Sequence, residues 1–238
     1  MEQNKVRTYF FYAVGEIALV MIGILLALQV NNWNEVRKER SVEQRILVTL
    51  KEDISNAILD LESQILSDSV KVRTIQTLLI GGPEKEALLS HPKIDSIMFY
   101  PLWSGASEAP VIQSYNDLKT SGDISVIKNR SIREELAEIE TGFINLNSQL
   151  KDFITVQQIR GDEIALKKVN FIRVLKKYRY TELTVGTENN YRELINDIEI
   201  QNVFGAKMIQ LDSIVNYRRL LLANCNKVIE LIDSQIIS

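Results

Sequence analysis

The segment 12-YAVGEIALVMIGILLALQV-30 is apolar enough to cross a membrane, and it contains a single acidic residue, Glu16. The run without any other charged residue extends from residue 9 to residue 30, longer than the roughly 20 helical residues that cross the hydrocarbon core. A cleaved signal peptide would have a shorter apolar core and a small-x-small cleavage motif, and neither is present. Residues 9–32 are therefore predicted to form an uncleaved transmembrane signal anchor after an N-terminal tail, residues 1–8.

Glu16 shares one face of this predicted helix with small and polar residues. At about 100° per residue, that face holds Tyr12, Glu16, Gly23, Ala27 and Asn34. Gly23 and Ala27 have the small-xxx-small spacing that lets two membrane helices approach closely. A carboxylate in hydrocarbon is costly unless it is protonated, paired or turned toward protein. We therefore expect these five residues to contact a second membrane helix, supplied by another copy or by a partner in a membrane complex.

Two roles for Glu16 follow from this placement. In one, it is a proton or ion site in an oligomeric pore. In the other, it is a packing residue that is protonated, hydrogen-bonded or directed toward the nearer membrane surface. The sequence does not choose between them.

The charges that flank the anchor give a weak signal about orientation. Cytoplasmic loops carry an excess of Lys and Arg, and acidic residues count little. A count alone slightly favours a cytoplasmic position for the C-terminal part. The basic residues counted are Lys5 and Arg7 before the anchor, and Arg37, Lys38, Arg40 and Arg45 after it.

The overall composition is that of a folded protein without an evident catalytic motif. The chain is 45% hydrophobic and 25% charged, with a net charge of −3, which disfavours disorder and generic nucleic-acid binding. One His and one Cys nearly exclude a His/Cys metal site, and no phosphate-binding, dinucleotide or nucleophile-elbow motif occurs. We therefore expect no enzyme, no catalytic or metal site, no cofactor and no nucleic-acid partner.

Three long segments show a coiled-coil-like hydrophobic repeat with alternating steps of 3 and 4 residues. The first is 35–80, which the "GGP" at 81–83 ends; the second opens near Ser131, and the third covers about 202–236. Asp68 and Arg218 are the polar residues in the first and third repeats, and they could pair with each other. The expected seams are Leu47, Leu50, Ile54, Ala57, Leu61, Ile65, Val72, Ile75 and Leu79; Ile132, Leu136, Ile139, Phe143, Leu146, Leu150 and Phe153; and Phe204, Met208, Leu211, Val215, Leu222, Cys225, Ile229, Ile232 and Ile236.

These segments predict an all-α fold: a transmembrane helix that continues into a long antiparallel helical bundle over residues 33–238. Residues 81–130 form an irregular insert, with one helix that has Pro110 in its first turn and Gly122 as its C-terminal cap. Ser131 and Glu134 are predicted to form a capping box. The stretch 178–185, "YRYTELTV", could form a short strand.

The basic run from 167 to 180, which follows the insert in the sequence, is the strongest indication of a binding surface. It could bind an acidic protein, anionic lipid head groups or, if this part of the chain lies in the cytoplasm, nucleic acid, although a solvated helix face explains it as well. His91 is expected in a loop and Cys225 in the core. The residues of this candidate basic patch are Lys167, Lys168, Arg173, Lys176, Lys177 and Arg179.

Two stretches resemble a known family of uncharacterised proteins from Bacteroidota, DUF6090. The first holds Gly15, Glu16 and Ile17 and the run 31–35, "NNWNE"; the second is the Tyr-x-x-Leu-x-x-x-Gly segment at 115–122. The resemblance implies one N-terminal membrane helix, with the N-terminus inside and the remaining chain in the periplasm. It implies no activity.

Together these observations favour a single-pass protein of the inner membrane that acts as a scaffold or accessory subunit. Its soluble domain is expected in the periplasm. Its expected contacts are membrane lipid and either a second copy or a membrane-complex partner bound through the anchor. A ligand-sensing bundle and an oligomeric ion or proton channel that uses Glu16 are the alternatives.

Overall fold

The computed structural model describes residues 3–103, 105–178, 182 and 186–236, and these residues form helices, turns and connecting segments without a strand. The all-α class is confirmed. The stretch 178–185 lies mostly outside the described residues; Tyr178 ends a helix. The elements in chain order are α1 (Gln3–Ile80), α2 (Pro83–Leu89), α3 (Ile94–Trp103), α4 (Gln113–Ser121), η1 (Asp123–Val126), α5 (Arg130–Val156), η2 (Gln157–Gly161), α6 (Asp162–Lys168), α7 (Phe171–Tyr178), α8 (Tyr191–Leu194) and α9 (Ile198–Asp233).

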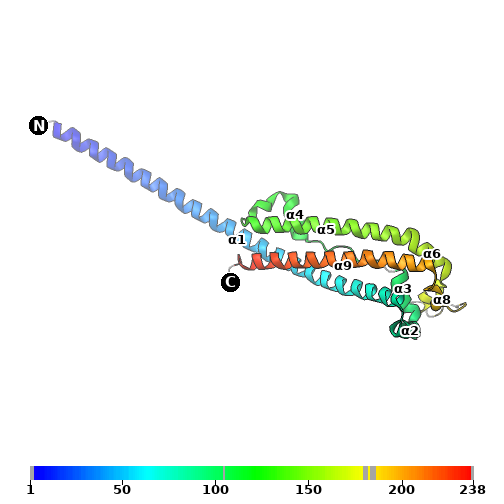
Figure 1. Cartoon of the computed structure of the whole chain (residues 1–238). Coiled ribbons are helices and arrows are strands. Elements are labelled where there is room, and N and C mark those ends of the chain that lie inside the picture. The colour runs from blue at the N-terminus through cyan, green and yellow to red at the C-terminus, as the bar shows by residue number, and fades with distance from the viewer. Residues whose placement is uncertain (1–2, 104, 179–181, 183–185, 237–238) are drawn as a thin grey trace.

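Helix α1 carries the predicted anchor and the first bundle helix without a break. Its 78 residues correspond to a length of roughly 120 Å. The N-terminal part projects alone from the bundle (Figure 1). Every described side chain from Gly15 to Val42 is exposed, and this part of α1 is long and apolar enough to cross a membrane. The helix ends at Ile80, immediately before the predicted stop at 81–83.

Helix α9 lies between α1 and α5 and runs antiparallel to both (Figure 1). Lys51 of α1 pairs with Asp233 at the end of α9, whereas Asp68, further along α1, pairs with Arg218. On the other side, Lys227 of α9 pairs with Glu135 of α5. The C-terminal end therefore returns to the place where α1 leaves the bundle.

The seam of α9 differs from the prediction by one residue at alternate positions. The predicted seam residues Met208, Leu222, Ile229 and Ile236 are only partly buried. The predicted seam residue Val215 is buried together with its neighbour Ile214. Elsewhere the buried residues keep steps of 3 and 4, so Lys207 joins Arg218 as a polar residue in the core. The buried residues of α9 are Ile200, Phe204, Lys207, Leu211, Ile214, Val215, Arg218, Leu221, Cys225, Val228 and Ile232. By contrast, all seven predicted seam residues of α5 are buried.

Two helix starts in the second third of the chain were predicted wrongly. Helix α4 begins at Gln113 with Ile112 as its N-cap, so Pro110 precedes the helix. The N-cap of α5 is Asn129, whose side chain accepts hydrogen bonds from the backbone N–H groups of Ser131 and Ile132. Asn129 thus takes the backbone N–H of Ser131, which Glu134 would have bound in the predicted capping box. Gly122 caps α4 as predicted, in the left-handed conformation with φ 80°.

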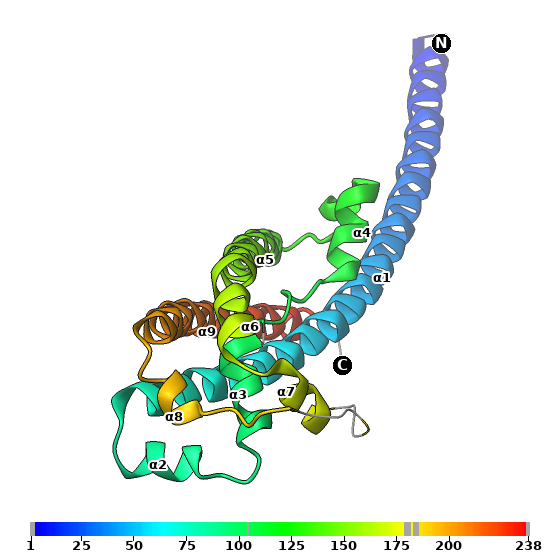
Figure 2. The ribbon, with the colours of Figure 1, turned by 90° about the vertical axis from the view of Figure 1, so that its right-hand side faces the viewer.

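The insert is more helical than predicted, and most of it gathers at one end of the bundle. Residues 81–130 contain α2, α3, α4 and η1. Figure 2 shows α2, α3, α7 and α8 together at the end of the bundle that lies farthest from the N-terminus.

Candidate functional site

A buried ion pair joins α1 to α9. The carboxylate of Asp68 accepts hydrogen bonds from Nη1 of Arg218 and, at 2.8 Å, from Nζ of Lys71. Asp68 and Arg218 are 1% and 0% exposed. The pairing of Asp68 with Arg218, which the two seam positions suggested, is thus confirmed; the additional cation Lys71 was missed.

Backbone carbonyl groups of the insert complete this ion cluster. Nζ of Lys71 donates to the carbonyl oxygen of Gly105 at 2.9 Å, and Nη2 of Arg218 donates to that of Ser107. These bonds satisfy donors that would otherwise be buried without a partner. The segment after α3 is therefore tied to the middle of the bundle through charged side chains.

A third buried cation, Lys207, lies near this cluster without a carboxylate partner. Its side chain is 3% exposed, and no ion pair involves it among the described residues. Nζ donates to the carbonyl oxygen of Tyr100 at the long distance of 3.4 Å and lies 5.9 Å from the ring centroid of Phe153. Burial lowers the pKa of Lys207 to about 7; the charge of Lys71 acts in the same direction, and that of Asp162 opposes it.

Next to Lys207, the end of α5 widens into a π-helical turn, η2. Gln157 continues the seam of α5 four residues after Phe153, and its buried amide donates to the Leu102 carbonyl oxygen at 2.6 Å and to Asp162 at 2.9 Å. A Cβ on Gly161 would lie 2.8 Å from Nε2 of Gln157, so the Gln157 side chain can keep this conformation only next to a glycine. Wide turns of this kind occur frequently at functional sites.

The wide turn borders a pocket of about 340 Å³ between η2, α6 and the first half of α9. Its lining residues Phe153, Gln157 and Lys207 are buried and form the inner end. The rim carries Arg160, for which no ion pair occurs within the described part of the chain. The remaining lining residues are Val156, Ile159, Gly161, Glu163, Ile164, Glu199, Asn202, Val203, Ala206 and Gln210.

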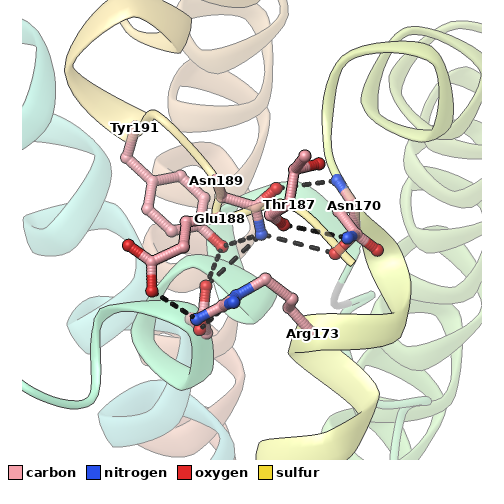
Figure 3. A network of polar contacts seen from close by, with 7 residues as sticks. Asn170, Arg173, Thr187, Glu188, Asn189 and Tyr191 are labelled. Atoms are coloured by element: carbon pink, nitrogen blue, oxygen red, sulfur yellow. Dashed lines mark hydrogen bonds and ion pairs between the residues drawn. The ribbon is translucent and has the colours of Figure 1, made fainter. Parts of the chain in front are cut away.

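A separate polar network holds the distal end of the bundle together (Figure 3). The hydroxyl of Tyr191 donates to Asp95 at 2.8 Å, and Asn189 donates to the same oxygen at 3.3 Å. Arg173 bridges Asp95, at 3.7 Å, and Glu188, at 3.2 Å. Burial and the hydrogen bond to Asp95 raise the pKa of Tyr191, which keeps the phenol protonated as a donor. The network joins α3, α7 and the segment before α8, which is a structural role.

The predicted basic patch is largely neutralised where its side chains are described. Lys167 pairs with Glu163, Lys168 pairs with Asp197 and Glu199, and Arg173 belongs to the distal network. The side chains of Lys176 and Lys177, and Arg179 as a whole, lie outside the described residues.

The predicted anchor stripe is exposed in the single chain. Glu16, Gly23, Ala27 and Asn34 are all exposed, and the side chain of Tyr12 lies outside the described part. A Cβ on Gly23 would meet no atom within 4 Å. Nothing in this chain covers the stripe along the described part of α1.

The polar residues that the sequence analysis missed lie on the helix seams. Lys71 follows Asp68 by three residues, and Lys207 follows Phe204 by three residues, so both fit the 3–4 spacing. That spacing was the available signal, but Met208, an apolar neighbour, fitted the predicted seam equally well. Within the described ranges, no three His, Cys, Asp or Glu side chains lie close enough together to hold a metal ion.

Comparison with known proteins gives one match. Residues 16–146 match the sequence model of a family described as a family of unknown function, DUF6090. The match covers more than half of the chain and includes the predicted anchor from Glu16 onward, the first bundle helix and the insert. No curated protein and no solved structure matches.

Proposed function

This chain belongs to the DUF6090 family, and we propose that it is a membrane-anchored helical-bundle scaffold that self-associates through the exposed stripe of its N-terminal helix. The observation that carries the proposal is the bare anchor: the described side chains from Gly15 to Val42 are exposed, and that part of α1 has no intramolecular partner. A hydrocarbon environment covers the apolar residues of such a helix, but it does not satisfy a carboxylate.

A second copy of the same helix meets this requirement with few assumptions. Gly23 and Ala27 lie one turn apart on the face of Glu16, and the open space at Gly23 lets another backbone approach. In a symmetric pair each copy contributes the same face, so Glu16 of one copy lies near Glu16 of the other. Each Glu16 side chain would then have a polar neighbour in place of hydrocarbon.

Disulfide cross-linking in isolated membranes tests the self-association. Asn34→Cys places a thiol on the stripe at the end of the apolar segment, and Asn32→Cys places one on a different face of the same turn. The native Cys225 is buried and does not interfere. The proposal expects a dimer of the chain with Asn34→Cys and much less with Asn32→Cys; equal cross-linking at both positions would contradict it.

A larger side chain at Gly23 tests whether the cross-links arise from a packed helix interface or from random collisions of chains in the membrane. Gly23→Leu fills the space for a second backbone, and a Cβ at this position meets no atom of the chain beyond its own helical backbone within 4 Å. Leu25→Phe is the matched control, because Leu25 is exposed on the opposite side of the helix. Cross-linking through Asn34→Cys should fall with Gly23→Leu and persist with Leu25→Phe.

The proposal places the anchor in the inner membrane and the bundle in the periplasm. Ser213→Cys introduces an exposed thiol on α9, whereas burial raises the pKa of Cys225 to about 12 and keeps it unreactive. A maleimide that cannot cross the inner membrane should label Ser213→Cys in intact spheroplasts and leave the unmodified chain unlabelled. Labelling only after lysis would place the bundle in the cytoplasm.

A further inference from the structure

The charges in the bundle core do not balance. Among the described residues, three cations in this region, Lys71, Lys207 and Arg218, are at least nine-tenths buried, and a single buried carboxylate, Asp68, lies among them. That carboxylate is already bound by Lys71 and Arg218. Asp95, the other buried carboxylate, belongs to the distal network.

Lys207 is therefore the cation without a counter-ion. A buried ammonium group normally has a carboxylate partner or several strong acceptors, because desolvation is costly. Within the described part of the chain, the polar contacts of Lys207 are the carbonyl of Tyr100 at 3.4 Å and the face of Phe153. Asp162, the nearest carboxylate that influences it, is held by the amide of Gln157 instead.

Lys207 is also one of the residues that line the pocket beside η2. Lys207, Gln157 and Phe153 form its inner end, and its volume of about 340 Å³ falls within the range of small-molecule sites. The walls between the inner end and the rim are mainly aliphatic, from Val156, Ile159, Ile164 and Val203.

The acidic residues of the rim are already engaged. Glu163 binds Lys167 and Glu199 binds Lys168, so both negative charges are compensated by surface lysines. Arg160 adds a positive charge at the mouth that has no ion pair within the described ranges. An anion can therefore enter the pocket without meeting an uncompensated carboxylate.

We propose that this pocket binds a small aliphatic monocarboxylate, with the carboxylate on the ammonium group of Lys207 and the apolar chain against the aliphatic walls. A single buried cation at the inner end matches one negative charge better than a phosphate or a dicarboxylate. The site is independent of the anchor and of self-association, and no residue of the anchor stripe takes part in it.

Equilibrium dialysis with radiolabelled hexanoate tests this site in the full chain held in lipid nanodiscs, with empty nanodiscs as the background. At about pH 6.5, which is below the lowered pKa of Lys207, hexanoate is ionised and most of the Lys207 side chains carry a proton. Saturable binding of one hexanoate per chain is expected, and unlabelled hexanoate should displace it far better than unlabelled 1-hexanol. Binding no greater than to empty nanodiscs, or equal displacement by the alcohol, would overturn the proposal.

Two variants locate the binding. Lys207→Met keeps the length of the side chain but removes the charge, and it should weaken hexanoate binding by about tenfold or more. Lys227→Met, at an exposed lysine of the same helix, is the matched control and should bind like the wild type. Unchanged binding by a folded Lys207→Met variant would refute the role of Lys207.

A pocket-filling variant keeps the test valid even if Lys207→Met does not fold. Ala206 is exposed at the pocket, so Ala206→Trp blocks it while Lys207 stays in place. Ile209→Trp is the control, because Ile209 is 68% exposed on α9 outside the pocket. Hexanoate binding should be lost in Ala206→Trp and kept in Ile209→Trp; retention in both would show that hexanoate binds elsewhere.

Discussion

At the scale of single residues, Asp68 is the negative charge on which the core of the bundle depends. Asp68→Asn leaves Lys71 and Arg218 buried with no carboxylate between them. Removing one partner of a buried pair typically costs about 3–5 kcal/mol, so we expect a loss of that size in the free energy of unfolding. Denaturant unfolding of the solubilised chain, followed by circular dichroism, measures it.

The control for this prediction is an ion pair of the same two helices at the surface. Lys51 and Asp233 are about half exposed, and such pairs contribute about 0–1 kcal/mol. Asp233→Asn should therefore change the free energy of unfolding little. If Asp68→Asn costs no more than Asp233→Asn, the buried cluster does not hold α1 and α9 together.

Removal of the charge of Lys207 should have the opposite effect on stability, because this charge destabilises the ligand-free bundle. The pKa of Lys207 is lowered from its ordinary value of 10.5 to about 7, so between these values the unfolded chain binds more protons than the folded one. The contribution of Lys207 to stability therefore rises with pH in that window, and its full cost applies below about pH 7. Two charged side chains also act on the pKa of Lys207: Lys71 lowers it and Asp162 raises it.

We therefore expect Lys207→Met to stabilise the ligand-free bundle, most strongly at and below about pH 7. The advantage over the wild type should shrink steadily as the pH approaches 10.5. Unfolding curves of both proteins across this range measure the difference. A difference that is constant with pH would mean that Lys207 is not a buried cation in the folded chain.

At the scale of helices, the start of α5 is set by Asn129. Its side-chain oxygen accepts hydrogen bonds from the backbone N–H groups of Ser131, at 2.9 Å, and Ile132, at 3.4 Å. Asn129→Ala should reduce the free energy of unfolding by about 1 kcal/mol, whereas Ser131→Ala should have little effect. A larger loss in Ser131→Ala than in Asn129→Ala would contradict this and support the capping box of Ser131 and Glu134 that the sequence suggested.

Periodicity predicted the long helices well because each one buries a continuous stripe. All seven predicted seam residues of α5 are buried, and Asp68 and Arg218 were correctly placed as facing polar residues. Periodicity failed at Lys207 and Met208, where two registers differ by one residue, because most other positions of both registers carry apolar side chains. Only the packing of α9 between two partners fixes that choice.

The pocket could not be predicted from the sequence, because it depends on a change of helical geometry. The wide turn at 157–161 follows a regular helical seam, and Gly161 alone signalled an irregularity there. The position of Tyr100 and Leu102 against that turn comes from the insert, whose helices α2 and α3 were not expected. Such contacts between distant segments leave no local pattern.

At the scale of the whole molecule, a single helix links a bare apolar segment to a closed bundle. The bundle buries its stripes within one chain, so it does not require a second copy. The anchor is different, because its stripe of Glu16, Gly23 and Ala27 has no cover in the described part of the chain. Assembly should therefore depend on the anchor and not on the bundle.

The most direct test of this account is the native mass of the particle released gently from membranes. The account predicts an integer multiple of 27.2 kDa, two or more, and a shift toward 27.2 kDa for Gly23→Leu. A particle of 27.2 kDa for the wild type would contradict self-association, and a mass that is not an integer multiple would mean that a different protein covers the stripe.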